Sequence, residues 1–249
     1  MDFCEPPLQV FKLSTTGSWP GARVPSRWFN SIGYVPRSHL PESIVGRPSN
    51  RKDLRQLSRD ETIDTLDVCM LIFAWGGMTA KNGKGVLQKL GWVSTAHNLR
   101  VGMIDHIKAY EQFFDHCAAD EIRNCGPAYY TKLLFFLPDT DEKRGIIMDQ
   151  WTARSINLLM GRPVVSLLKN SSPAGSYRVS SSNSCSTYQK FCELVGALAA
   201  RLMITKEEAE MRLFSEGRGK GRWREYVKQH DPLDVRSPSR SPGPKTEQW

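Results

Sequence analysis

The sequence predicts a mostly α fold, with eight or more helices behind an irregular N-terminal arm. Apolar residues recur at three- and four-residue spacing in the segments 128–137 and 187–203, as on one face of a helix. Ser58 and Glu61 have the spacing of a capping box at the start of another apolar run. Residues 1–57 are instead rich in Pro, Gly, Ser and Arg, which favours irregular structure.

Composition divides the chain into three parts. The arm, residues 1–57, is expected to pack on the rest through aromatic side chains such as Trp28 and Tyr34. Residues 58–230 form one helical domain, long enough to bury its own core, with a helical hairpin near 119–137. Residues 231–249 lack a sustained hydrophobic pattern and are expected to be disordered.

Periodic apolar residues and helix-start signals locate the individual helices. The first strong helix is expected over 58–74, apolar on more than one side and therefore central. The glycine-rich segment 78–85 and the serine-rich segment 170–186 predict turns and loops. Further helices are predicted at 86–90, 105–117, 119–123, 128–137, 151–159 and 187–203, and after Thr205, with Glu208 at the capping-box position.

Composition also narrows the class of partner. The formal net charge of +8 favours a polyanion as the partner.

No apolar run reaches the roughly eighteen residues of a membrane span, and the N-terminus lacks the regions of a signal peptide, so we expect a cytoplasmic protein. The six cysteines are scattered without a CxxC pair, which indicates reduced thiols and argues against a zinc finger or an iron–sulfur cluster. We expect no metal and no cofactor.

One stretch has the features of a nucleic-acid site. Cys125-Gly126-Pro127 is a tight turn that opens a helix, and free backbone N–H groups at a helix N-terminus suit a phosphate. An apolar segment then leads to a single acid, Asp149, at the start of the next helix. A carboxylate held there suits chemistry on a nucleotide. The alternatives are an ordinary helix–helix corner and an aspartate that only caps its helix.

This pattern resembles the helix-hairpin-helix DNA glycosylases, and most closely the bacterial proteins with an 8-oxoguanine-glycosylase fold. The resemblance extends over about residues 59–227. Gly126 matches the hairpin glycine, and Asp149, 23 positions later, matches the catalytic acid of that superfamily. The resemblance implies double-stranded DNA with a modified base as the partner. The turn formed by Cys125, Gly126 and Ala128 would bind the backbone of that DNA.

The same resemblance bears on the nucleophile. Bifunctional members carry a lysine two residues after the hairpin glycine, where this chain has Ala128. The match therefore implies a monofunctional enzyme, with water as the nucleophile. Lys132 lies one helical turn further along the same face, where it could supply an amine or bind a phosphate. The alternative is a solvated or salt-bridged lysine.

Other residues are candidates for binding the base or the DNA. A flipped base needs a stacking surface and polar groups for its edge. The candidates for that lining are Trp75, His106, Gln150 and Trp151. The candidates for phosphate contacts are Arg154, Arg218, Lys220 and Arg222. Core packing of the aromatics and solvation of the basic segment are the alternatives.

These features lead to a hypothesis about function. The chain would extrude one modified nucleotide from duplex DNA and hydrolyse its base–sugar bond, acting as a monomer. Among bacterial proteins of this kind, one known role is antiphage defence by removal of glucosylated hydroxymethylcytosine. Repair of oxidised or alkylated purines, a non-catalytic DNA-binding module, and an all-α interaction protein are the alternatives.

Overall fold

The computed structural model describes residues 2–17, 21–140, 142–170, 176–215 and 221–230. Within these ranges the chain forms thirteen helices and one two-stranded antiparallel sheet, so the fold is mostly α. The helices are α1 (Glu5–Lys12), α2 (Pro25–Ile32), α3 (Glu42–Val45), α4 (Arg51–Arg59), α5 (Thr65–Trp75), α6 (Ala80–Val86), α7 (Trp92–Arg100), α8 (His106–Ala118), α9 (Pro127–Phe136), α10 (Gln150–Met160), α11 (Cys185–Leu202), α12 (Lys206–Phe214) and α13 (Arg222–His230). The strands are β1 (Leu167–Lys169) and β2 (Tyr177–Val179).

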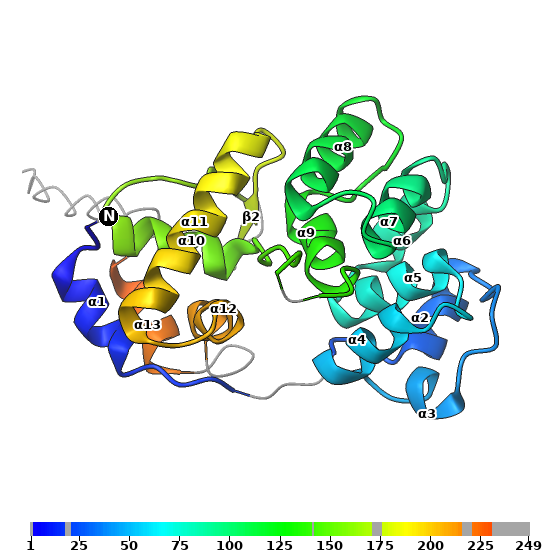
Figure 1. Cartoon of the computed structure of the whole chain (residues 1–249), viewed down its shortest axis with the longest axis horizontal. Coiled ribbons are helices and arrows are strands. Elements are labelled where there is room, and N and C mark those ends of the chain that lie inside the picture. The colour runs from blue at the N-terminus through cyan, green and yellow to red at the C-terminus, as the bar shows by residue number, and fades with distance from the viewer. Residues whose placement is uncertain (1, 18–20, 141, 171–175, 216–220, 231–249) are drawn as a thin grey trace, which may run out of the picture.

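The helices form two groups that lie side by side (Figure 1). One group contains α2 to α9, and α5 packs against α2, α4, α7 and α9 within it. The other contains α1 and α10 to α13, where α10 packs against α1, α11, α12 and α13. The segment between α9 and α10 joins the groups, and α8 packs on α11 across them.

Helix α5 is the centre of the first group. All eleven of its residues are buried, because most of its side chains are apolar and neighbouring helices cover it. The side chain of Asp64 caps its N-terminus by accepting a hydrogen bond from the Leu66 N–H at 2.8 Å. The expectation that Ser58 caps this helix is wrong: Ser58 lies near the end of α4, and the turn between the two helices separates it from α5.

The N-terminal arm is not irregular, since it contains α1 to α4. Prolines lie in the first turn of α1 and begin α2, where a missing N–H costs nothing, and Asn50 with Asp53 forms a capping box on α4. The aromatic residues Trp28, Phe29 and Tyr34 of this segment are buried in the common core.

Several short elements also differ from expectation. The segment 119–123 is a turn rather than a helix, and the left-handed residues Asp120 and Asn124 break any helical path there. The segment 78–85 is not a loop, since Thr79 caps α6. Helix α7 has no counterpart among the predicted helices, and β2 lies within the expected loop 170–186, where it pairs with β1.

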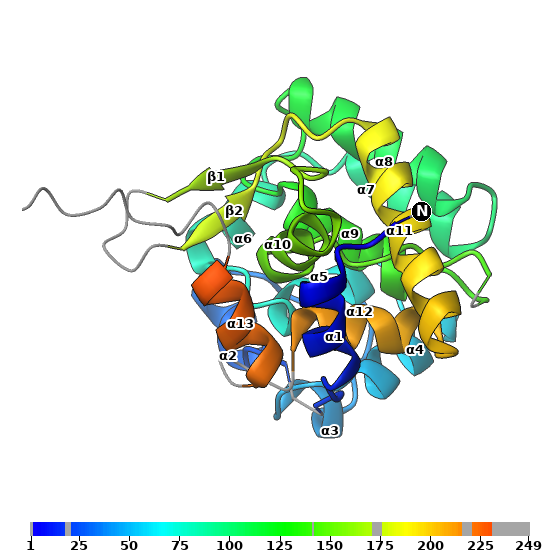
Figure 2. The ribbon, with the colours of Figure 1, turned by 90° about the vertical axis from the view of Figure 1, so that its left-hand side faces the viewer.

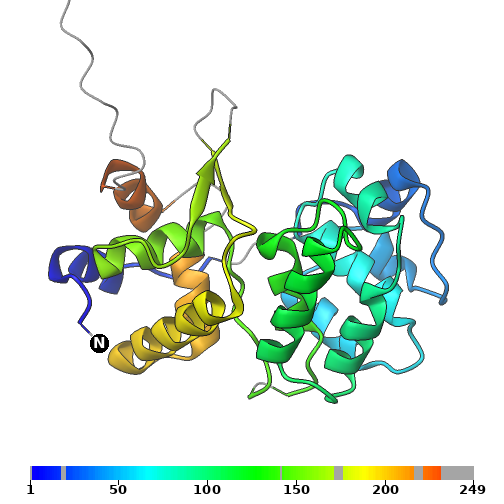
Figure 3. The same cartoon turned by 90° about the horizontal axis from the view of Figure 1, so that it is seen from above.

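The hairpin of β1 and β2 stands at the edge of the molecule, beyond the ends of the surrounding helices (Figures 2 and 3). Strand β2 packs on both α9 and α10. The predicted disordered tail, 231–249, lies outside the described residues. No described helix combines the length and the hydropathy that a bilayer span requires.

Candidate active site

The turn before α9 leaves its helix N-terminus accessible. Gly126 is the N-cap residue, has an extended backbone and gives α9 no side-chain cap, while Pro127 supplies the first helical position. A Cβ placed on Gly126 would meet nothing within 4 Å. Cys125 is buried, so its thiol is not offered to a ligand. Backbone N–H groups can therefore approach an anion closely here.

This turn borders the outer cleft, a depression of about 650 Å³. Its wall comes from α9 and the preceding turn on one side and from the β1–β2 hairpin on the other. The polar side chains of Asn82, Asn124, Gln150 and Asn170 and two tyrosine rings, Tyr129 and Tyr177, line it.

Asp149 lies at the inner end of the outer cleft. It is the N-cap of α10: its Oδ1 accepts hydrogen bonds from the N–H groups of Trp151 at 2.7 Å and Thr152 at 3.0 Å. Thr152 completes a capping box, because its hydroxyl accepts from the Asp149 N–H at 3.0 Å. The capping role considered from the sequence is therefore real. Oδ2 accepts no hydrogen bond from the described residues and can face a ligand.

Lys132 lies opposite, on the second turn of α9. Its side chain is 7% exposed, and its Nζ donates a hydrogen bond to the Ala128 carbonyl one turn earlier. Burial lowers the pKa of Lys132, and the negative charge of Asp149 opposes that shift. Lys132 is thus neither solvated nor held in an ion pair by any described carboxylate.

Gly76, at the end of α5, makes room for this lysine. A Cβ on Gly76 would lie 2.7 Å from Lys132 Cδ and 3.0 Å from Cε. Only glycine therefore lets the amine reach its present position. Gly76, Lys132 and Asp149 border both the outer cleft and a second, smaller cavity, so they surround the opening between the two.

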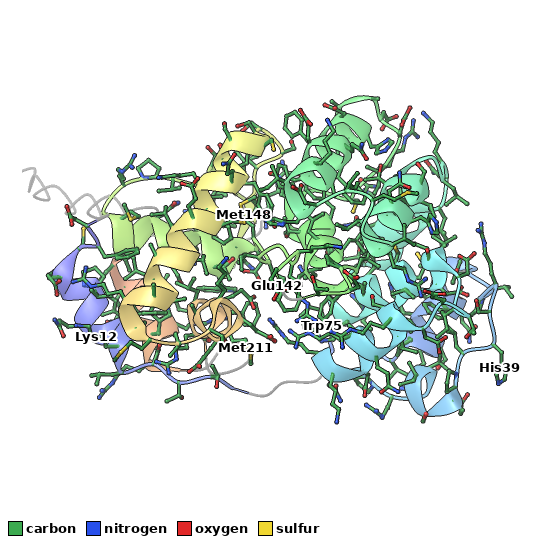
Figure 4. The ribbon with its side chains drawn as sticks, in the orientation of Figure 1. Lys12, His39, Trp75, Glu142, Met148 and Met211 are labelled. Atoms are coloured by element: carbon green, nitrogen blue, oxygen red, sulfur yellow. The ribbon has the colours of Figure 1, made fainter. Side chains whose placement is uncertain are left out.

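The inner cavity has a volume of about 250 Å³ and lies between the two helix groups. Ala22, Trp75 and Ile147 contribute apolar wall, together with Phe214 from α12. Figure 4 shows Trp75 at the boundary of the groups, across from Met211 of α12. The Trp75 ring packs edge-on against Phe136, with centroids 4.9 Å apart.

Two charged side chains complete the inner cavity, and the sequence interpretation missed both. Arg51 of α4 donates from Nη2 to Oε2 of Glu210 on α12 at 2.7 Å. Glu210 is 1% exposed; burial raises its pKa, and Arg51 counteracts that rise. The available signal was helical spacing, because Glu210 shares a face of its helix with the apolar Leu213 and Phe214.

The other candidate residues divide between these cavities and the core. Trp75 borders the inner cavity and Gln150 the outer cleft, where the Gln150 Oε1 accepts from the Tyr177 N–H at 3.0 Å. His106 lines neither; its Nδ1 lies 3.1 Å from the Lys143 carbonyl oxygen, and burial lowers its pKa. The site therefore does not include His106.

Trp151 borders neither cavity, because cationic side chains cover its ring. The guanidinium carbons of Arg224 and Arg154 lie 3.9 Å and 4.7 Å from the ring centroid. Arg154 is 2% exposed, so it is a core residue rather than a surface phosphate ligand. Arg222 is exposed at the start of α13, whereas Arg218 and Lys220 lie outside the described residues.

Nothing in the described part of the chain gathers three or more metal-binding side chains into one group. The titratable groups that border the opening are the carboxylate of Asp149 and the amine of Lys132. The two face a cavity large enough for a planar ring and lie beside a helix N-terminus suited to a phosphate.

Comparison with known proteins assigns the chain to a family. No curated protein and no solved structure matches the chain. A family model does match, over residues 23–214, and the family is described as putative 8-oxoguanine DNA glycosylase OGG-like protein. The match includes α2 to α12, and therefore every residue that borders the opening. The chain belongs to this OGG-like family.

Proposed function

We propose that this protein is a DNA glycosylase that extrudes a modified nucleotide from double-stranded DNA and cleaves the bond between its base and its sugar. The observation that carries the proposal is the opening, where a carboxylate and a buried amine meet between a surface cleft and an inner cavity. A base in the inner cavity would have its sugar at Asp149 and Lys132. The family match supports the same reaction class.

Asp149 would act on the sugar. Breaking an N-glycosidic bond builds positive charge on the sugar ring, and a nearby carboxylate stabilises that charge. Oδ1 is held by α10, so the orientation of the carboxylate is fixed while Oδ2 can face the sugar. Capping and catalysis are therefore compatible roles for one side chain.

Two nucleophiles fit the opening: a water molecule oriented by Asp149, and the amine of Lys132. Ala128 at the position of the family's usual lysine favours water. The structure supports the amine, because burial shifts Lys132 toward its neutral, nucleophilic form. In that route Nζ bonds to C1′ and loses a proton, while the base leaves with the bonding electrons and takes up a proton.

The DNA backbone would dock at the turn before α9, through the N–H groups around Gly126, with the net charge of +8 adding long-range attraction. Because these contacts involve phosphates, they are independent of sequence. The preference for one base would then depend on the cavities.

A cytosine carrying a sugar, as in glucosylated phage DNA, is the substrate that we favour, and removing it would serve antiviral defence. The observation in favour is the outer cleft, whose amide side chains and tyrosine rings are typical of surfaces that bind sugar hydroxyls. An oxidised or alkylated purine is the second candidate, and the family description favours oxidised guanine.

The test is incubation with duplexes that each contain one defined base, followed by alkaline cleavage. The panel contains glucosylated hydroxymethylcytosine, 8-oxoguanine, an alkylated purine and unmodified bases. Wild type should form abasic sites in one of the modified duplexes. Asp149→Asn should lower the rate at least a hundredfold without unfolding, because Asn caps a helix as well as Asp does.

Reductive trapping decides between the nucleophiles. Trapping of a protein–DNA adduct that Lys132→Met abolishes would establish the amine route. Full excision by Lys132→Met without trapping would leave water as the nucleophile. Salt-sensitive DNA binding with no abasic sites in any duplex would show a non-catalytic binding module instead.

A further inference from the structure

The charged wall of the inner cavity has no role in the reaction described so far. Arg51 and Glu210 come from α4 and α12, one from each helix group, and their ion pair crosses the boundary between the groups. Glu210 is 1% exposed, and the Arg51 guanidinium lies over the Phe135 ring at 4.7 Å. Removing two charges from water costs free energy, so their position on a cavity wall needs an explanation.

Unsatisfied hydrogen-bonding groups border the same cavity. The Trp75 indole N–H is buried and has no hydrogen-bond acceptor among the described residues. Nη1 of Arg51 is also buried without an acceptor; its nearest charged partner is Oε1 of Glu207, at the longer ion-pair distance of 3.6 Å. Oε2 of Glu210 accepts a hydrogen bond from Arg51, and Oε1 accepts none from the described part of the chain. Buried polar groups are normally paired, so these two donors and one acceptor are fit for a ligand.

The residues that the inner cavity shares with neighbouring depressions show where this charged wall lies relative to the opening. The inner cavity meets the outer cleft at Gly76, Lys132 and Asp149, whereas it shares Arg51 with a third depression on the α4–α12 side. Arg51 therefore borders the inner cavity without bordering the outer cleft. A base that enters with its sugar at Asp149 would direct its distal edge to Arg51 and Glu210, between the rings of Trp75 and Phe214.

We propose that Arg51 and Glu210 bind the Watson–Crick edge of the flipped base and select bases with an amino group over their oxo counterparts. This inference rests on the proposed function. Ionised Glu210 can only accept hydrogen bonds, so it pairs with an exocyclic amino group and repels a carbonyl oxygen at the same position. Arg51 donates to the ring nitrogen or carbonyl beside that amino group. Cytosine-type and adenine-type edges meet this requirement, and uracil-type and hypoxanthine-type edges do not.

The experiment compares matched amino and oxo duplexes: cytosine-type against uracil-type, and adenine-type against hypoxanthine-type, each with the modification that wild type prefers. Two quantities are measured. One is the single-turnover excision rate, and the other is the affinity for the same duplexes made uncleavable by 2′-fluorination. Wild type should prefer the amino member of each pair by about tenfold or more.

Glu210→Gln is the test variant, because glutamine keeps the shape and adds an N–H donor that tolerates a carbonyl. It should lower the amino-to-oxo ratio on the order of tenfold. Glu207→Gln is the matched control. Glu207 pairs with Arg51 and Arg55 but does not border the inner cavity, so its variant should keep the wild-type ratio. A duplex with a preformed abasic site has no base to contact the wall, and Glu210→Gln should bind it as wild type does.

The outcomes separate this inference from the proposed function. Excision with a ratio that Glu210→Gln leaves unchanged overturns the inference alone. A Glu210-dependent affinity ratio without any excision overturns the proposed function alone. Weaker binding of the abasic duplex by Glu210→Gln, with an unchanged ratio, assigns Glu210 a purely structural role.

Discussion

At the scale of single residues, the opening depends on Gly76 leaving space for Lys132. Gly76→Ala would bring a methyl group within 2.7 Å of Lys132 Cδ and 3.3 Å of the Ile72 carbonyl oxygen. The Gly76 backbone has a φ of −69°, which alanine adopts readily, so the chain should still fold. We expect the displaced amine to lower reductive trapping at least tenfold, measured on duplexes with a preformed abasic site. Gly91→Ala, whose nearest new contact is 3.9 Å away, is the control and should react as wild type does.

Lys132 should also determine the pH dependence of trapping. Only the neutral amine attacks, and burial lowers the pKa of Lys132, so the rate should rise with pH and reach its plateau below the range of an ordinary lysine. The charge of Asp149 raises this pKa. Asp149→Asn removes that influence, so the half-maximal rate, normalised to each plateau, should move to lower pH. A profile that stays in place or moves to higher pH in Asp149→Asn would contradict the assigned coupling.

At the scale of elements, one buried carboxylate connects the N-terminal segment to the central helix. Asp67 of α5 accepts hydrogen bonds from the Tyr34 hydroxyl at 2.5 Å, the Arg37 N–H at 3.0 Å and the Ser38 N–H at 2.7 Å. Asp67→Ala leaves all three donors without this acceptor. We expect it to lower the free energy of unfolding by about 2–4 kcal/mol in urea titration. Asp115→Ala, at an exposed position of α8, should change stability by less than about 0.5 kcal/mol.

Local signals predicted the elements that border the two cavities, because those elements begin with strong local features. Gly126-Pro127 begins α9, Asp149 caps α10 and Thr205 caps α12, all as expected. The short N-terminal helices were missed because their prolines and glycines dominate the composition, although those prolines sit at helix starts. The Arg51–Glu210 pair was not predictable in this way, since 159 positions separate its members and only the packing of α4 near α12 brings them together.

At the scale of the whole molecule, the site exists only where the two helix groups meet. Arg51 and Arg55 from one group pair with Glu207 and Glu210 from the other, so ion pairs join the two groups beside the inner cavity. Lys132 comes from one group, Asp149 caps a helix of the other, and the segment between α9 and α10 fixes their relation. Neither group alone contains an opening with both an amine and a carboxylate.

A positive charge at the edge of the outer cleft should contribute to the salt dependence of DNA binding. Arg178 and Leu168 form a cross-strand pair on the β1–β2 hairpin; both are exposed and border the cleft, and Arg178 forms no ion pair within the described chain. If DNA lies in the cleft, Arg178 would contact a phosphate and release a counterion on binding. The logarithm of the association constant should fall linearly with the logarithm of salt concentration, and Arg178→Gln should reduce the magnitude of that slope by about 1.

The control is Lys12→Gln on α1, at an exposed position outside the cleft lining, which should leave the slope unchanged. Equal slopes for wild type and Arg178→Gln would mean that the duplex does not reach the hairpin, and the DNA path would then have to run past the turn before α9 on its other side.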